Sequence, residues 1–285
     1  MKDLWFYAGK MHRCRGGTID ITMNKYLYIM KTKIQTVLSY RFDVLSTIFV
    51  QCITMFAICY FWLAVYGETD SAQGVSGKDM LTYTTISILM GNLLTMNVQH
   101  RIVDSIRTGN VALDMLKPMN IYFSYLAEDL GEAVVAFFQK ALPLLLISSL
   151  MFGLPQVASP VHFILFLFSF VFSWFINWLL AAMLGLWAFR TFSMGPMMAV
   201  KTYIIKLLSG SMIPLWFFPD MLQRILELLP FVNIYQVPLG IYIGKYSIRS
   251  SLEHMAVQLF WDVALLAVFT VLQRKMAEQV LVQGG

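Results

Sequence analysis

Residues 141–189 read ALPLLLISSLMFGLPQVASPVHFILFLFSFVFSWFINWLLAAMLGLWAF, a run of 49 residues without Asp, Glu, Lys or Arg. A helix needs about 20 apolar residues to cross the hydrocarbon core of a bilayer, so this run is too long for one crossing. Gly153, Pro155 and Pro160 interrupt it, and residues of these types end helices. The run therefore predicts a hairpin of two membrane-spanning helices.

The composition of the whole chain also indicates that most of it is surrounded by lipid. Of its 285 residues, 58% are hydrophobic and only 13% are charged, whereas a soluble domain has about 25% charged residues. The apolar content also excludes a disordered chain. We therefore expect an all-α membrane protein.

Apolar runs of helical length predict six membrane-spanning helices in a domain that covers residues 44–285, after a cytoplasmic N-terminal segment, 1–43. The second span is rich in Thr and Asn, which need hydrogen-bond partners in a bilayer, so it should face other helices. The first span should itself act as the insertion signal. The six predicted spans cover residues 44–65, 80–99, 122–151, 161–189, 202–218 and 255–272.

The distribution of Lys and Arg predicts the orientation. The side that holds both termini carries 15 of these residues and the opposite side carries 4, so both termini should be cytoplasmic. Residues 24–41 combine an apolar helical stripe with basic flanks. Such a helix is expected to lie in the interface against anionic headgroups. The alternative is a soluble helix packed on a protein partner.

Two ionisable residues in predicted spans are candidates for the translocation path. Lys140 follows Glu132 by about 12 Å of helix rise, which places it near the middle of the bilayer. A Lys there indicates a functional site by default, although it could instead pair with Gln139 or with a group on another helix. Asp262 in the last span could be a path residue or a hydrogen-bonded interior carboxylate. Lys206 can extend to the cytoplasmic face.

No motif for enzyme chemistry occurs in the sequence. A phosphate-binding loop needs G-x-x-x-x-G-K-[ST], and none of the Gly–Lys pairs is followed by Ser or Thr. The four His and three Cys residues lack metal-ligand spacing. We therefore expect no catalytic, cofactor-binding or metal-binding residue on this chain, and any ATP must be bound by a partner.

Three segments carry a resemblance to a known family. Residues 101–111 read RIVDSIRTGNV, and 116–118 read LKP. Gly210, Pro214 and the FPD of 218–220 precede the last span, and the chain ends in VQGG. From about Asn24 onward the chain resembles the type-2 ABC exporter permeases, in particular their six-span branch.

The resemblance implies that residues 100–118 form a coupling segment that docks on the ATPase. Ile102, Val103 and Ile106 would supply an exposed apolar face, with charged residues around it, and Gly109 is placed to end the helix. The alternative is an ordinary cytoplasmic loop. The coupling residues expected from the resemblance are Arg101, Ile102, Val103, Asp104, Ile106, Arg107 and Gly109.

The resemblance also implies an external re-entrant segment at residues 219–244. Apolar residues there recur with helical spacing, and aromatic residues flank them, as is typical of a bilayer interface. The alternative is a surface helix without a gating role. The external gate residues expected from the resemblance are Pro214, Phe218, Pro219, Leu222, Ile225 and Pro230.

The family further implies the partners. The chain would be the permease subunit of an ATP-driven exporter in a bacterial-type plasma membrane. A separate ABC ATPase in two copies would hold ATP and magnesium, and a second permease, identical or paralogous, would complete the path. Membrane lipid and an amphipathic or lipid-like substrate (a drug, glycolipid or peptide) are expected, and nucleic acid is not. The rival interpretations are an ion-coupled secondary transporter and a membrane scaffold without transport.

Overall fold

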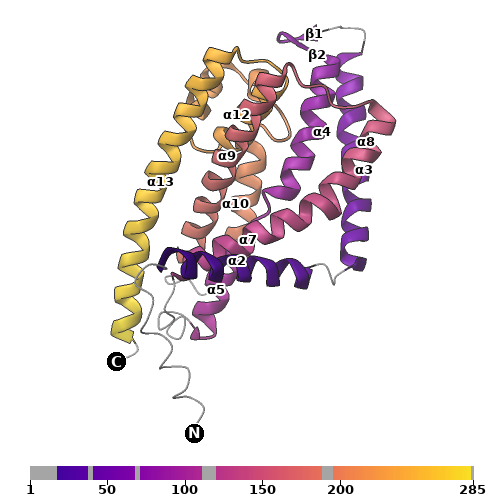
Figure 1. Cartoon of the computed structure of the whole chain (residues 1–285). Coiled ribbons are helices and arrows are strands. Elements are labelled where there is room, and N and C mark those ends of the chain that lie inside the picture. Colours follow the sequence, from indigo (N-terminus) through magenta and orange to yellow (C-terminus); the bar gives the residue numbers. More distant parts are fainter. Residues whose placement is uncertain (1–17, 38–40, 68–70, 111–119, 188–194, 284–285) are drawn as a thin grey trace.

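The computed structural model describes residues 18–37, 41–67, 71–110, 120–187 and 195–283. These residues are almost entirely helical, apart from a short hairpin of β1 (Ser71–Ala72) and β2 (Val75–Ser76), so the predicted α-helical architecture is confirmed (Figure 1). The helices are α2 (Thr18–Val37), α3 (Arg41–Tyr66), α4 (Gly77–Leu93), α5 (Val98–Arg107), α7 (Ile121–Ala136), the π-helix η1 (Phe137–Ala141), α8 (Leu142–Phe152), α9 (Pro160–Leu186), α10 (Gly195–Leu208), the 3-10 helix η3 (Leu215–Phe217), α11 (Asp220–Glu227), α12 (Val232–Tyr242) and α13 (Ile248–Gln283).

Within the described residues, four helices are long and apolar enough to cross a membrane. They correspond to the first, third, fourth and sixth predicted spans. A fifth crossing is possible if α11 and α12, which meet at 108°, count as one broken span. The four candidates are Val44–Tyr66, Ile121–Phe152, Pro160–Leu186 and Ile248–Lys275.

The second and fifth predicted spans are shorter than the sequence indicates, so the count of six is not confirmed. Helix α4 has 17 residues and α10 has 14, and a straight crossing needs about 20. Helix α10 ends at Leu208 because the chain turns at Gly210, where φ is +80°, a conformation that glycine adopts readily. The predicted continuous helix over 202–218 is therefore wrong.

Helix α4 lies in the interior, as its polar composition predicts. Thr82, Thr84, Thr85 and Asn92 are all buried. Gln51 of α3 donates a hydrogen bond from its Nε2 to Asn92 Oδ1 over 2.6 Å. These groups are satisfied or shielded by neighbouring helices, which is what a polar helix in lipid requires.

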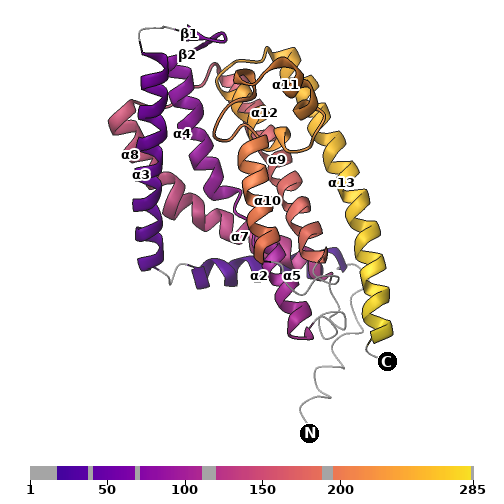
Figure 2. The same ribbon diagram turned by 180° about the vertical axis from the view of Figure 1, so that it is seen from behind.

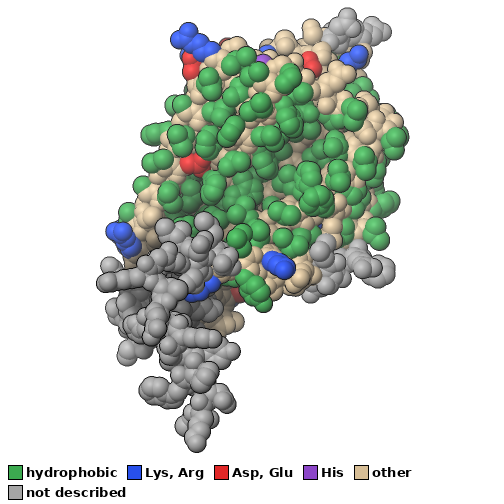
Figure 3. Space-filling model, viewed as in Figure 1, with side chains coloured by type: hydrophobic (Ala, Val, Ile, Leu, Met, Phe, Trp, Pro, Cys, Tyr) green, Lys and Arg blue, Asp and Glu red, His purple; other side chains and the backbone are tan. Residues whose placement is uncertain are grey.

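The surface separates into an apolar band and two charged ends. In Figure 3 hydrophobic side chains cover the middle of the molecule, and Lys and Arg gather at its upper and lower edges. Large apolar residues such as Phe49 on α3, Leu150 on α8 and Phe168 on α9 are more than half exposed. An exposed apolar band of this kind fits hydrocarbon as the solvent.

The segment predicted to be re-entrant, residues 219–244, enters the protein interior more deeply than the sequence suggests. Every residue of α12 from Val232 to Tyr242 is buried, and α12 packs mainly on α9. The fully buried Gln258 of α13 donates a hydrogen bond from Nε2 to Asn233 O at 2.8 Å and accepts one from Ser169 Oγ at 2.9 Å. This network ties α12 to α9 and α13, so α12 is part of the bundle core.

Helix α2 lies at the end of the molecule where α13 terminates, and it runs across the direction of α3 and α13 in both ribbon views (Figures 1 and 2). Its Leu27 and Tyr28 side chains are exposed. Helix α5 projects beyond α2 at the same end. Helix α5 therefore lies at the edge of the apolar band, and the interfacial position of α2 stays a prediction.

Candidate coupling site

Helix α5 begins at a carboxylate supplied by another helix. Asp129 of α7 accepts hydrogen bonds from the backbone N–H groups of Asn97 and Val98, each over 3.2 Å. The first N–H groups of a helix have no partner within the helix, and a negative charge there also complements the helix dipole. Asp129 therefore fixes where α5 starts and how it is oriented on α7.

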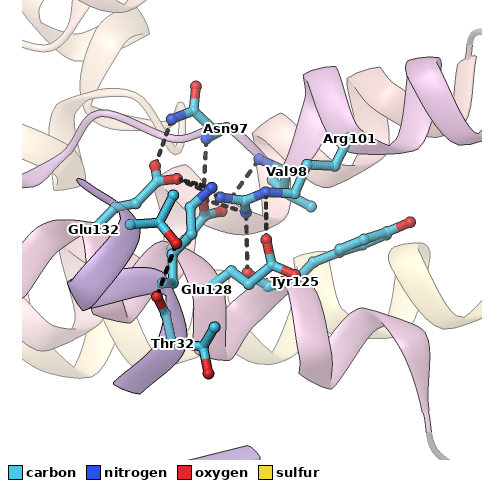
Figure 4. Close-up of polar contacts among 10 residues, drawn as sticks. Thr32, Asn97, Val98, Arg101, Tyr125, Glu128 and Glu132 are labelled. Carbon is cyan, nitrogen blue, oxygen red and sulfur yellow. Dashed lines mark hydrogen bonds and ion pairs between the residues drawn. The ribbon is translucent and has the colours of Figure 1, made fainter. Parts of the chain in front are cut away.

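Arg101 lies one turn into α5 and points inward, toward α7 (Figure 4). Its guanidinium pairs with Asp129 at 2.7 Å, with Glu132 at 2.7 Å and with Glu128 at 2.9 Å. Burial alone would lower the pKa of Arg101, but the three carboxylates, Asp129 foremost, raise it. Only 15% of the side chain is exposed, and the three carboxylates keep the guanidinium charged there.

Glu132 connects this cluster to α2. Lys33 Nζ lies 2.9 Å from Glu132 Oε1, and Asn97 donates a hydrogen bond to the other oxygen of Glu132. On the opposite side of the cluster, the Trp178 indole of α9 donates to Asp129 Oδ2 at 3.0 Å. One group of charges therefore joins α2, α5, α7 and α9. We call Lys33, Arg101, Glu128, Asp129 and Glu132 the Arg101 cluster.

The backbones of α2 and α7 also approach closely. A Cβ added at Gly131 would lie 3.0 Å from Met30 O, so the absence of a side chain at this position permits the crossing. At the other end of the contact, Tyr26 OH accepts a hydrogen bond from Asn120 N at 3.2 Å, and the Tyr26 and Phe123 rings lie 6.1 Å apart. Three contacts therefore hold α2 on α7: the Lys33–Glu132 ion pair, the close approach at Gly131 and the Tyr26 contacts.

The predicted exposed apolar face of the coupling segment is wrong. Ile102 and Val103 are each 4% exposed. Ile102 packs against Gly185 of α9, and Val103 packs against Met198 of α10; Ile106 is half-buried against the main core. The apolar stripe of α5 is real, but helices of the same chain cover it.

The exposed residues of α5 are polar. They are His100, Asp104 and Arg107, and Gly109, which follows the helix, is exposed as well. Gly109 has φ +71°, and its N–H bonds Ile106 O at 3.2 Å, so it ends the helix as the sequence predicts. Residues 111–119, including the rest of the predicted coupling segment, lie outside the described residues.

The ABC-2 family transporter protein model matches residues 52–282. The chain belongs to this family. It is therefore a membrane permease of an ABC transporter, as the resemblance in the sequence indicates, and the family implies an ABC ATPase as its partner. No curated protein matches the chain.

The two path candidates of this permease are not brought together. Lys140 lies half-buried in η1, and its side chain forms no hydrogen bond or ion pair with the side chain of another described residue, Gln139 included. Asp262 is half-buried on α13, and its Oδ1 is buried without a hydrogen-bond partner in the described part of the chain. Neither belongs to the Arg101 cluster, and their roles stay predictions.

Some predicted gate residues of the permease are buried in the protein, and others lie on its surface. Pro214 and Pro230 are buried and Phe218 is half-buried. Pro219 precedes α11, whose Leu222 and Ile225 are exposed at 38% and 48%. The apolar stripe of α11 therefore faces outward.

Sequence reasoning missed the residues that hold this segment. The single O–H of Tyr83 lies between two acceptors, Gly210 O at 2.7 Å and Gln236 Oε1 at 3.0 Å. Gln236 Oε1 also accepts from Leu215 N at 3.1 Å. The only available signal was the presence of polar residues in apolar runs, and the positions of their partners are set by the tertiary fold.

Proposed function

We propose that this permease exports an amphipathic or lipid-like substrate, driven by a separate ABC ATPase that acts on the exposed end of α5. The observation that carries the proposal is the two-sided construction of α5. Its inner side is fixed by the Arg101 cluster and by Ile102, while its outer side projects beyond α2 with exposed charges.

The exposed side of α5 is suited to a protein partner. His100, Asp104 and Arg107 are exposed and lie at helical spacing on one face. Charges of both signs specify a partner and its register more than they add affinity. Two ATPase copies, carrying ATP and magnesium, would each press on one such surface when they close.

The remaining features of the proposal follow the membrane geometry. The Lys and Arg bias favours a cytoplasmic location for the end that holds α2 and α5, with both termini on that side in a bacterial-type plasma membrane. A second permease, identical or paralogous, would complete the path. The aromatic and largely uncharged composition of the predicted spans favours a substrate with a large apolar part.

The test is isolation of the complex from native membranes in mild detergent through a tag on this chain. We expect an ABC ATPase to co-purify and to hydrolyse ATP. Arg107→Glu should reduce the bound ATPase by roughly tenfold or more, in the range of a truncated interface anchor. The matched control is Arg249→Glu, which makes the same change at a side chain 92% exposed at the opposite end of the molecule.

Three outcomes decide between the functions. A bound ATPase that is lost only with Arg107→Glu supports the exporter. A preparation without any ATPase, but with transport driven by an ion gradient, would favour the secondary transporter and direct attention to Asp262. A preparation with neither activity would favour a scaffold.

A further inference from the structure

Two arginines of α5 have opposite surroundings. Arg107, in the last turn, is exposed. Arg101, in the second turn, has a side chain that is only 15% exposed and lies against three carboxylates of α7. A side chain buried to this degree, with its guanidinium already paired within the chain, has little surface to offer a partner. The two arginines therefore cannot serve the same purpose.

We infer that Arg101 is a positioning residue that makes α5, α7 and α2 one mechanical unit, and that it does not touch the ATPase. This inference rests on the proposed function, because the ATPase is the source of the movement. Arg101 holds α5 to α7 through a planar fork, which fixes direction as well as distance. Asp129 adds two backbone contacts at the start of α5, and Lys33 adds α2 through Glu132.

We expect a movement of α7 to reach the π-helical turn that follows this helix. This helix continues directly into η1, the π-helical turn Phe137–Ala141 that contains Lys140. Here Leu142 N–H bonds Phe137 O, the i→i−5 pattern of a π-helix. Pro143 has no N–H to donate to the preceding turn, so the regular ladder is interrupted here. Such turns are places where a helix changes geometry and are frequent at functional sites.

Glu132 makes α2 part of the same unit. Its carboxylate is shared by Arg101 and Lys33, and α2 crosses α7 closely at Gly131. A displacement of α5 relative to α2 would break these partly buried ion pairs and leave their charges without compensation, which is unfavourable. We therefore expect the three helices to move together, and we expect the π-helical turn η1 to be the place where the third span changes its geometry.

The experiment compares Arg101→Met with Arg107→Met in the purified complex with its ATPase. Hydrogen–deuterium exchange is measured without nucleotide and after trapping with ATP and orthovanadate. In the wild type, trapping should change exchange in both 98–107 and 137–141. Arg101→Met should keep wild-type amounts of ATPase and the change in 98–107, but lose the change in 137–141. Arg107→Met should instead lose ATPase by roughly tenfold.

A second variant decides the matter if Arg101→Met does not assemble. Arg101→Lys keeps the charge but cannot reach three carboxylates with a planar fork, so it should bind ATPase normally and show a reduced change in 137–141. An unreduced nucleotide-dependent change in 137–141 in the Arg101 variant would overturn the inference, as would loss of ATPase from Arg101→Lys. If the wild type binds no ATPase, the proposed function fails first, which is a different result.

Discussion

Replacing Asp129 with Asn should destabilise the permease far more than replacing its neighbour Glu128 with Gln. The Asp129 carboxylate is completely buried, and it accepts hydrogen bonds from two backbone N–H groups of α5, from Arg101 and from the Trp178 indole. An amide has one acceptor oxygen, and its NH₂ group would face donors. Among the described residues Glu128 forms an ion pair with Arg101 only, and it is 26% exposed.

The expected difference in stability between the two variants follows from how deeply each carboxylate is buried. Removing one charge from a buried pair costs about 3–5 kcal/mol, and this figure already includes part of the roughly 1 kcal/mol contribution of the helix cap. A partly exposed pair contributes about 0–1 kcal/mol. At roughly 2 °C per kcal/mol, the lower end of the range for chains of this size, Asp129→Asn should lower Tm by about 6–10 °C and Glu128→Gln by at most about 2 °C.

Scanning fluorimetry of the purified permease in one detergent measures both variants side by side. Both substitutions remove one negative charge and keep the shape of the side chain, so a general charge effect would shift both equally. Equal shifts, or a wild-type Tm for Asp129→Asn, would refute the assignment of Asp129 as the buried anchor of α5.

Two further predictions concern orientation and path. In a variant without the natural cysteines, Ser71→Cys and Ser247→Cys should react with an impermeant thiol reagent on intact cells, whereas Thr108→Cys should not; labelling of Thr108→Cys would contradict the proposed orientation. Lys140→Met should assemble with its ATPase but alter ATP hydrolysis in membranes that contain substrate. Loss of assembled protein would instead indicate a structural pairing for Lys140 within the complete complex.

The sequence predicts the long helices well because lipid imposes a simple length rule. The first, third, fourth and sixth predicted spans coincide with the four candidate spans among the described residues. The end of α5 at Gly109 was also predictable, because glycine readily adopts the positive φ found there. These features depend on local composition and not on which helices become neighbours.

The short helices and the covered face of α5 depend on neighbours, so the sequence could not decide them. The helical spacing of Ile102, Val103 and Ile106 predicts one buried apolar face. It does not show whether a partner chain or the same chain covers that face. A signal was nevertheless present. Glu128, Asp129 and Glu132 stand close to the start of a predicted span, and three carboxylates at that depth require a cation from elsewhere in the protein.

The choice of ions at this junction is itself informative about what the junction does. Well-packed apolar side chains can hold helices together as firmly as a buried ion pair, and often more so. Apolar contacts are non-directional, however, so they allow a helix to roll on its neighbour. The fork of Arg101 on Asp129 and Glu132, together with the capped start of α5, resists rolling. On the proposed function, a push by the ATPase on the exposed end of α5 should therefore turn α7 as well. The interrupted hydrogen-bond ladder of η1 is the nearest place along α7 where we expect that turn to be absorbed.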